Sequence, residues 1–111
     1  MIDYPKIYAV DFDGTLSLGE RYPTIGQPNK PLIAFLQERQ QEGDRIILWT
    51  CREGEYLTAA VQFCRENGLI FDAVNDNTRE NQKAFGNNCR KVCAHYYIDD
   101  RSCWKEEWDN V

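Results

Sequence analysis

Strand-like and helix-like segments alternate along this chain, and this alternation restricts the fold more than any other feature of the sequence. Apolar runs rich in β-branched and aromatic residues predict buried strands at 7–10, 45–49, 71–74 and 96–98. Apolar residues at helical spacing from Leu32 and from Leu57 predict two amphipathic helices, each followed by a glycine. The polar segment 75–88 predicts a loop with one short helix. Strands that alternate with helices predict an α/β fold around a central parallel sheet with right-handed crossovers.

The composition is that of one small domain. The 111 residues are 42% apolar, which is enough for a single packed core, so we expect one domain over 1–111. The net charge of −5 disfavours nonspecific binding to nucleic acid or to anionic membranes. The segment Met1–Lys6 lacks the features of a signal peptide, and no stretch has the ~20 apolar residues of a membrane span. We therefore expect a cytoplasmic protein.

Polar side chains follow three of the four predicted strands. Asp11 and Asp13 come after the first strand, Thr50 after the second, and Asp99 and Asp100 after the last. Parallel strands place their carboxyl ends at one edge, where open α/β sheets bind ligands, so we expect these groups to converge. Several carboxylates at one edge repel one another unless a divalent cation neutralises them. Mg²⁺ suits this set of oxygen ligands and is the cofactor that we expect.

The two aspartates after the first strand are suited to different chemical tasks. One carboxylate at a strand end can act as a nucleophile or as a cation ligand, and a second, two residues later, can exchange a proton with a leaving group. Lys91, eight residues before Asp99, is near enough to place its ammonium group at the same edge. Arg52 lies near the start of the second predicted helix and is a candidate for holding a substrate anion.

These residues together resemble a known series of motifs. Asp11-Phe12-Asp13-Gly14-Thr15, then Thr50, a lysine and Asp99-Asp100 are similar to the four motifs of the haloacid dehalogenase superfamily of phosphohydrolases. The match runs over nearly the whole chain, and the first motif is highly specific. The resemblance implies an α/β, Rossmann-like three-layer sandwich with a central parallel sheet. It also implies a magnesium-dependent phosphatase that hydrolyses a phosphate monoester through an aspartyl phosphate. Core elements fill both intervals where a cap domain normally enters, which implies a small capless member.

The resemblance also implies a role for each matching aspartate. Asp11 would attack phosphorus, and Asp13 would protonate the leaving oxygen and then activate the water that hydrolyses the intermediate. The Asp11 side chain and the Asp13 backbone carbonyl would bind Mg²⁺. One carboxylate of the last pair would join them, with Asp100 favoured as the direct ligand and Asp99 behind it.

Other matching residues would bind the substrate phosphate. Thr50 would hydrogen-bond a phosphoryl oxygen, and Lys91 would offset the developing negative charge. Gly14 would let the backbone approach the phosphate closely, and Thr15 and Arg52 complete the predicted substrate site.

The catalytic lysine, the substrate and the assembly stay open at this point. Lys83, sixteen residues before Asp99, is the alternative to Lys91, because many members of the superfamily carry this lysine further upstream. The identity of the phosphorylated substrate is open. Without a cap, segment 17–30, segment 75–88 or another subunit must exclude water from the active site. The oligomeric state is therefore open, and a homo-oligomer is one of the alternatives.

Two other functions compete with the phosphatase. One is a non-catalytic or regulatory member of the same fold, which binds metal or phosphate without turnover. The other, less favoured, is a phosphorelay receiver domain, which also combines such a sheet with acidic residues, a threonine and a lysine. A receiver normally carries its phosphorylated aspartate after the third strand, whereas Phe71–Val74 leads into Asn75-Asp76.

Overall fold

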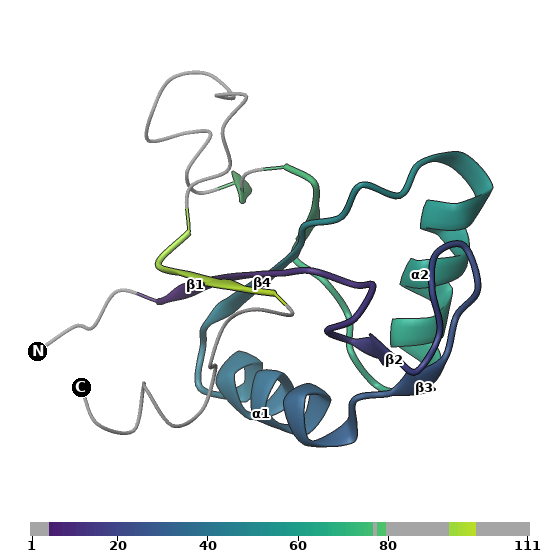
Figure 1. Ribbon diagram of the computed structural model, residues 1–111. Helices are drawn as coiled ribbons and strands as arrows, with labels where there is room; N and C mark the ends of the chain where they lie inside the picture. The colour runs from purple at the N-terminus through teal and green to yellow at the C-terminus, as the bar shows by residue number, and fades with distance from the viewer. Residues whose placement is uncertain (1–4, 77, 80–93, 100–111) are drawn as a thin grey trace, which may run out of the picture.

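The computed structural model describes residues 5–76, 78–79 and 94–99. Its elements in chain order are β1 (Ile7–Val10), β2 (Ser17–Leu18), β3 (Gln27–Pro28), α1 (Lys30–Gln41), β4 (Arg45–Leu48), α2 (Gly54–Glu66), β5 (Ala73–Val74) and β6 (Tyr96–Ile98). Four strands form a parallel sheet in the order β5-β4-β1-β6, and β2 pairs with β3 in a short antiparallel ribbon (Figure 1). The predicted α/β, Rossmann-like fold with a parallel sheet is confirmed.

Strand β1 has neighbours on both sides, and its register decides which residues enter the core. Val10 lies opposite Leu48 of β4 and Ile98 of β6. Side chains alternate between the two faces of a strand, so residues at even positions of β1 share one face. That face carries the larger apolar cluster, which includes Tyr8, Val10, Ile46, Leu48 and Ile98. The other face carries a smaller cluster of Ile7, Ala9 and Ile47.

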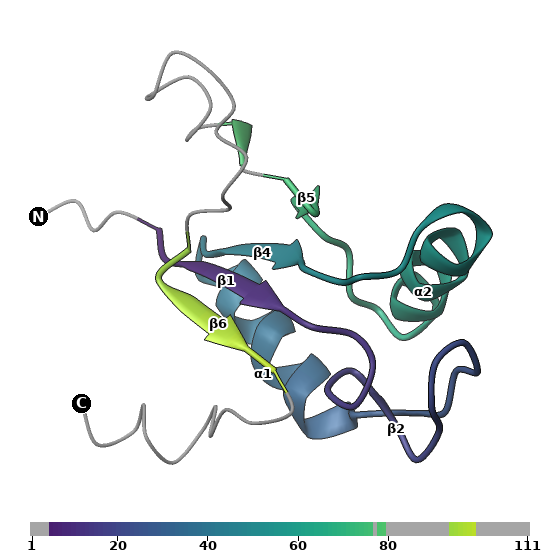
Figure 2. The same ribbon diagram turned by 45° about the horizontal axis from the view of Figure 1, so that its top comes forward.

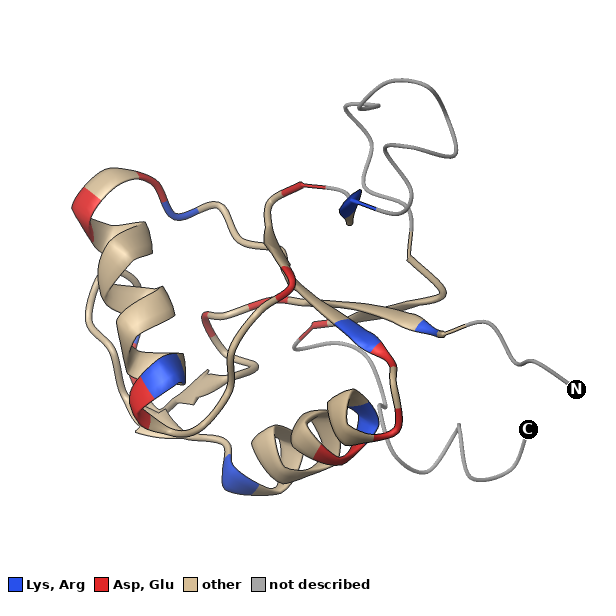
Figure 3. Ribbon diagram, turned by 180° about the vertical axis from the view of Figure 1, so that it is seen from behind, with Lys and Arg blue, Asp and Glu red and all other residues tan. Residues whose placement is uncertain are grey.

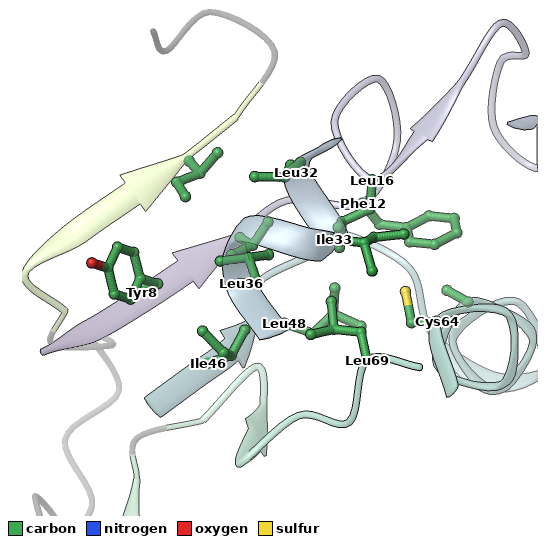
Figure 4. Close-up of a cluster of buried hydrophobic side chains, with 13 residues drawn as sticks. Tyr8, Phe12, Leu16, Leu32, Ile33, Leu36, Ile46, Leu48, Cys64 and Leu69 are labelled. Carbon is green, nitrogen blue, oxygen red and sulfur yellow. The ribbon is translucent and has the colours of Figure 1, made fainter. Parts of the chain in front are cut away.

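Helix α1 covers the larger apolar face of the sheet. The Asn29 side chain caps its N-terminus by accepting the Leu32 N–H at 3.3 Å, and Pro31 lies in the first turn, where no backbone N–H is needed. The chain leaves the helix through Gly43, whose φ of 100° suits glycine. Leu32, Ile33 and Leu36 of α1 are buried in this larger apolar cluster (Figure 4).

Helix α2 lies beyond the carboxyl ends of the strands, beside the β2–β3 ribbon (Figures 1 and 2). It buries Ala60 and Cys64 in the same cluster that receives the apolar residues of α1. The Phe63 ring meets Phe12, which follows β1, edge to face at 5.8 Å. Charged residues lie near the ends of both helices (Figure 3), with Arg39 and Arg65 in the last turns, where a cation favours the helix dipole.

Two predicted segments differ from the structure. The predicted strand 71–74 is shortened to β5, because the side chain of Asp72 takes over backbone pairing: its Oδ2 accepts the Ile46 N–H at 2.7 Å. Segment 17–30, for which the sequence pattern indicated no strand, contains the β2–β3 ribbon and leads into α1. Most of the predicted loop and short helix at 75–88 lies outside the described residues. In the part of the chain that the structure describes, no helix has the length and apolar character needed to cross a bilayer.

The buried thiol of Cys64 makes the stability sensitive to alkaline pH. Burial raises the pKa of this thiol to about 12. As the pH rises above the ordinary thiol pKa, the unfolded chain ionises at this position while the folded chain does not, so the free energy of unfolding falls. We expect ionisation of Cys64 in the unfolded chain to lower the free energy of unfolding by about 1–2 kcal/mol between pH 9 and 10.5, as measured by urea unfolding.

Paired alanine variants isolate this effect. Cys64→Ala should lose less stability over that pH interval than the wild type, whatever its stability at neutral pH. Cys51→Ala removes an exposed thiol and should keep the wild-type pH dependence. Equal pH dependence in the wild type and Cys64→Ala would contradict the prediction.

Candidate active site

The carboxyl ends of three strands meet around a pocket. Backbone hydrogen bonds continue beyond the strands: Asp11 donates to the Ile98 carbonyl and Trp49 to the Val10 carbonyl, each at 2.8 Å. A pocket of about 530 Å³ opens here, lined by Ala9, Asp11, Trp49, Thr50, Cys51, Tyr97, Ile98 and Asp99. Asp11, Thr50 and Asp99, which the sequence places after three different strands, therefore line one pocket.

Two of these pocket residues supply carboxylates from neighbouring strands. Asp11 is half-buried at the end of β1, and Asp99 is exposed at the end of β6. Mg²⁺ binds proteins through one or two carboxylates and keeps several waters, so this pair of hard oxygen donors fits it. Among the residues that the structure describes, no three His, Cys, Asp or Glu side chains are grouped closely enough to form a fuller metal cage. Asp100, the favoured direct ligand, lies outside the described residues.

A tight turn follows Asp11 and depends on glycine. The Phe12 carbonyl accepts backbone N–H groups from Thr15, Leu16 and Ser17 at 2.9–3.2 Å, so the chain folds back at once. Gly14 has a φ of 78° and donates its N–H to the Ser17 carbonyl at 2.9 Å. A side chain at this φ would be strained, which explains the glycine after the second aspartate.

Thr15, predicted to bind substrate, lies in the interior of this turn. It is buried, and its carbonyl accepts a hydrogen bond from the Asn29 side chain at 2.8 Å. Within the described residues its hydroxyl has no hydrogen-bond partner, and it does not line the pocket. The residue therefore ties the turn to the start of α1 in this structure.

Asp13 and Arg52 form a bidentate ion pair. The guanidinium Nε donates to Oδ2 at 2.9 Å and Nη2 donates to Oδ1 at 2.7 Å. The Arg52 side chain is 1% exposed, whereas the Asp13 side chain is 27% exposed. A charged group this deeply buried needs a partner of opposite charge, and two parallel bonds to a carboxylate are the strongest form of such a pair.

Further contacts fix the guanidinium of Arg52 from the other sides. It donates to the backbone carbonyls of Pro23 and Tyr56 at 3.1 and 3.3 Å. The rings of Phe12 and Tyr22 lie 4.8 and 5.1 Å from its central carbon, within the range of cation–π attraction. The sequence predicted that Arg52 holds a substrate anion; the anion that it contacts in this structure is the Asp13 carboxylate. The difference arises because the chain turns inward after Thr50, whose Oγ1 accepts the Arg52 N–H at 3.2 Å.

Thr50 is held by Asn75, the residue that directly follows β5. The Asn75 side chain accepts the Thr50 N–H at 2.7 Å, and the Asn75 N–H donates to the Leu48 carbonyl at 2.7 Å. Asn75 has a φ of 51°, a conformation in which asparagine is enriched. An asparagine directly after a predicted strand was the only sequence signal for this role.

Both candidate lysines fall outside the described residues. Lys91 and Lys83 belong to segment 80–93. The choice between them therefore stays a prediction.

A solved structure resembles this chain over most of its length. It is that of a conserved protein coded by a locus of Bacteroides thetaiotaomicron, with 42% sequence identity and a TM-score of 0.74. The match covers 90% of this chain and 79% of the Bacteroides chain. The chain belongs to the same family as this conserved Bacteroides protein. No protein-family model and no curated protein matches the chain.

Proposed function

We propose that this chain is a magnesium-dependent phosphohydrolase, similar to small capless members of the haloacid dehalogenase superfamily, that uses Asp11 as its nucleophile. One observation carries the proposal. Asp11, which directly follows β1, shares a pocket with Asp99, which directly follows β6, and with Thr50. A nucleophile, a cation ligand and a hydroxyl donor for phosphate are thus available in one site.

The reaction proceeds in two displacements at phosphorus. In the first, an Asp11 carboxylate oxygen bonds to phosphorus, the bond from phosphorus to the leaving oxygen breaks, and that oxygen takes a proton from Asp13. In the second, water attacks the aspartyl phosphate and gives a proton to Asp13. The bond between phosphorus and Asp11 then breaks, which restores the carboxylate and releases inorganic phosphate.

Other groups of the chain hold the phosphate. The Arg52 N–H bonded to Thr50 Oγ1 leaves the threonine hydroxyl hydrogen to donate to a phosphoryl oxygen. Mg²⁺, bound by the Asp11 side chain, the Asp13 carbonyl and one carboxylate of the Asp99-Asp100 pair, would supply the positive charge that lets a carboxylate approach an anionic phosphate. In a chain of net charge −5, Lys91 or Lys83 adds the local positive charge that the reaction needs.

One observation favours the non-catalytic alternative. Both oxygens of Asp13 accept hydrogen bonds from Arg52, which is also what a purely structural ion pair would show. A receiver domain is less favoured, because the residue after β5 is Asn75, and its side chain is bonded to the Thr50 N–H. The phosphatase and the non-catalytic protein differ in turnover and not in fold, so an assay separates them.

The proposal predicts hydrolysis that depends on magnesium. Purified protein should hydrolyse 4-nitrophenyl phosphate with Mg²⁺, lose this activity in excess EDTA and regain it when Mg²⁺ is restored. Glu53→Gln, which removes an exposed carboxylate outside the pocket, is the matched control and should keep wild-type activity. Turnover that EDTA leaves unchanged would contradict the metal requirement. Absence of turnover across a panel of aryl and alkyl phosphates would favour the non-catalytic protein.

A further inference from the structure

Arg52 connects two parts of the site that are far apart in the sequence. One is the Asp13 carboxylate, and the other is the segment 17–28, which comprises β2, β3 and the loop between them and is called the flap below. At the loop of the flap, the Pro23 carbonyl accepts Nη2 of Arg52 at 3.1 Å, and the Tyr22 ring packs over the guanidinium. The same Nη2 atom donates to Asp13 at 2.7 Å, so one nitrogen bridges the flap and the carboxylate.

The flap is itself a defined structure with fixed points. The Gly26 N–H donates to the Ser17 hydroxyl at 2.8 Å, and the Asn29 N–H donates to the Leu16 carbonyl at 2.9 Å. A Cβ at Gly26 would lie 2.0 Å from the Leu18 carbonyl oxygen, so the two sides of the ribbon approach as closely as glycine allows. The Tyr22 ring also meets Tyr56 of α2 at 5.6 Å. The flap therefore lies against α2, beside the carboxyl edge of the sheet (Figure 2).

We propose that Arg52 is a positioning residue, which orients the Asp13 carboxyl for proton transfer and fastens the flap to it. The proposal rests on the proposed function. An ionised carboxylate has about four acceptor positions, and Arg52 uses two of them, so Asp13 can carry a proton on a remaining lone pair while its orientation is held. The rigid fork of arginine restricts both carboxylate oxygens at once, which lysine cannot do.

A series of substituted phenyl phosphates tests the proposal, because a poor leaving group needs protonation more than a good one. Arg52→Lys and Arg52→Gln should lower kcat for phenyl phosphate about 100-fold, but for 4-nitrophenyl phosphate under about 10-fold, with KM little changed. Asp13→Asn should show the same dependence on the leaving group. Adding Arg52→Lys to Asp13→Asn should cost little more, since both changes remove one function. Arg65→Gln, which changes an exposed arginine of α2, is the control and should match the wild type.

Three results would overturn the proposal. An equal loss with every leaving group would indicate a purely structural arginine. Faster turnover of phenyl phosphate would show that Arg52 restrains Asp13 instead of aiming it. A raised KM with unchanged kcat would indicate that Arg52 binds the substrate anion directly.

A second measurement does not require activity. It therefore distinguishes failure of the proposed function from failure of the proposed attachment of the flap. In Arg52→Lys, amide hydrogen exchange at Gly26 and Asn29 should accelerate, because the flap has lost its attachment, while exchange in α1 stays unchanged. If the wild type hydrolyses no ester but this acceleration occurs, the proposed function fails and the attachment of the flap stands. Unchanged exchange at both amides would overturn the attachment.

Discussion

Asp11→Asn is expected to abolish hydrolysis, with a loss of about 10⁴-fold or more, because the amide cannot form the aspartyl phosphate. The wild type, quenched in acid during turnover of a ³²P-labelled ester, should yield a labelled peptide that contains Asp11. The variant should yield none. The aspartate and asparagine side chains have nearly the same shape, so the fold and the thermal midpoint of unfolding should change little. Circular dichroism checks both.

Two controls make the result specific to the nucleophile. Glu53→Gln makes the same chemical change in an exposed carboxyl outside the pocket and should keep both activity and labelling. Activity in Asp11→Asn close to that of the wild type would exclude Asp11 as the nucleophile. A label recovered on a peptide without Asp11 would assign the covalent step to another residue.

Leu48→Ala is expected to cost about 3 kcal/mol of unfolding free energy, because the vacated volume lies in the middle of the core. Leu48 is 0% exposed on β4, between Val10 of β1 and Val74 of β5. Its side chain packs in the cluster that α1 covers, among Leu36, Leu69 and Cys64 (Figure 4). Urea unfolding followed by circular dichroism measures the change.

Leu18→Ala is the matched control for this core substitution. It removes the same atoms from a residue of the flap that is 38% exposed, and it should cost under about 1 kcal/mol. Equal losses in the two variants would contradict the assignment of the core. Leu48 belongs to the core cluster and does not line the pocket. We therefore expect Leu48→Ala to lose stability but to keep the magnesium-dependent turnover per folded molecule unchanged.

Much of the site was predictable, because strand ends in a parallel sheet obey a simple geometric rule. Asp11, Thr50 and Asp99 each follow an apolar run, and runs of this kind form β1, β4 and β6. Parallel pairing then brings the three ends to one edge without any further information. The flap was less predictable, because β2 and β3 have two residues each and show no periodicity.

The sequence by itself determined the order and type of the main elements and the edge at which the polar residues gather, because local periodicity and chain direction decide both. Only the tertiary structure decided the partners of those residues. Arg52 pairs with Asp13, 39 positions away, and Asn75 holds Thr50, 25 positions away. An arginine near a helix start looks the same in sequence whether it faces solvent or an internal carboxylate. The rings of Phe12 and Tyr22 pack around the guanidinium and bury it. A buried charge is stable only beside a group of opposite charge, so Arg52 pairs with the Asp13 carboxylate and does not face solvent.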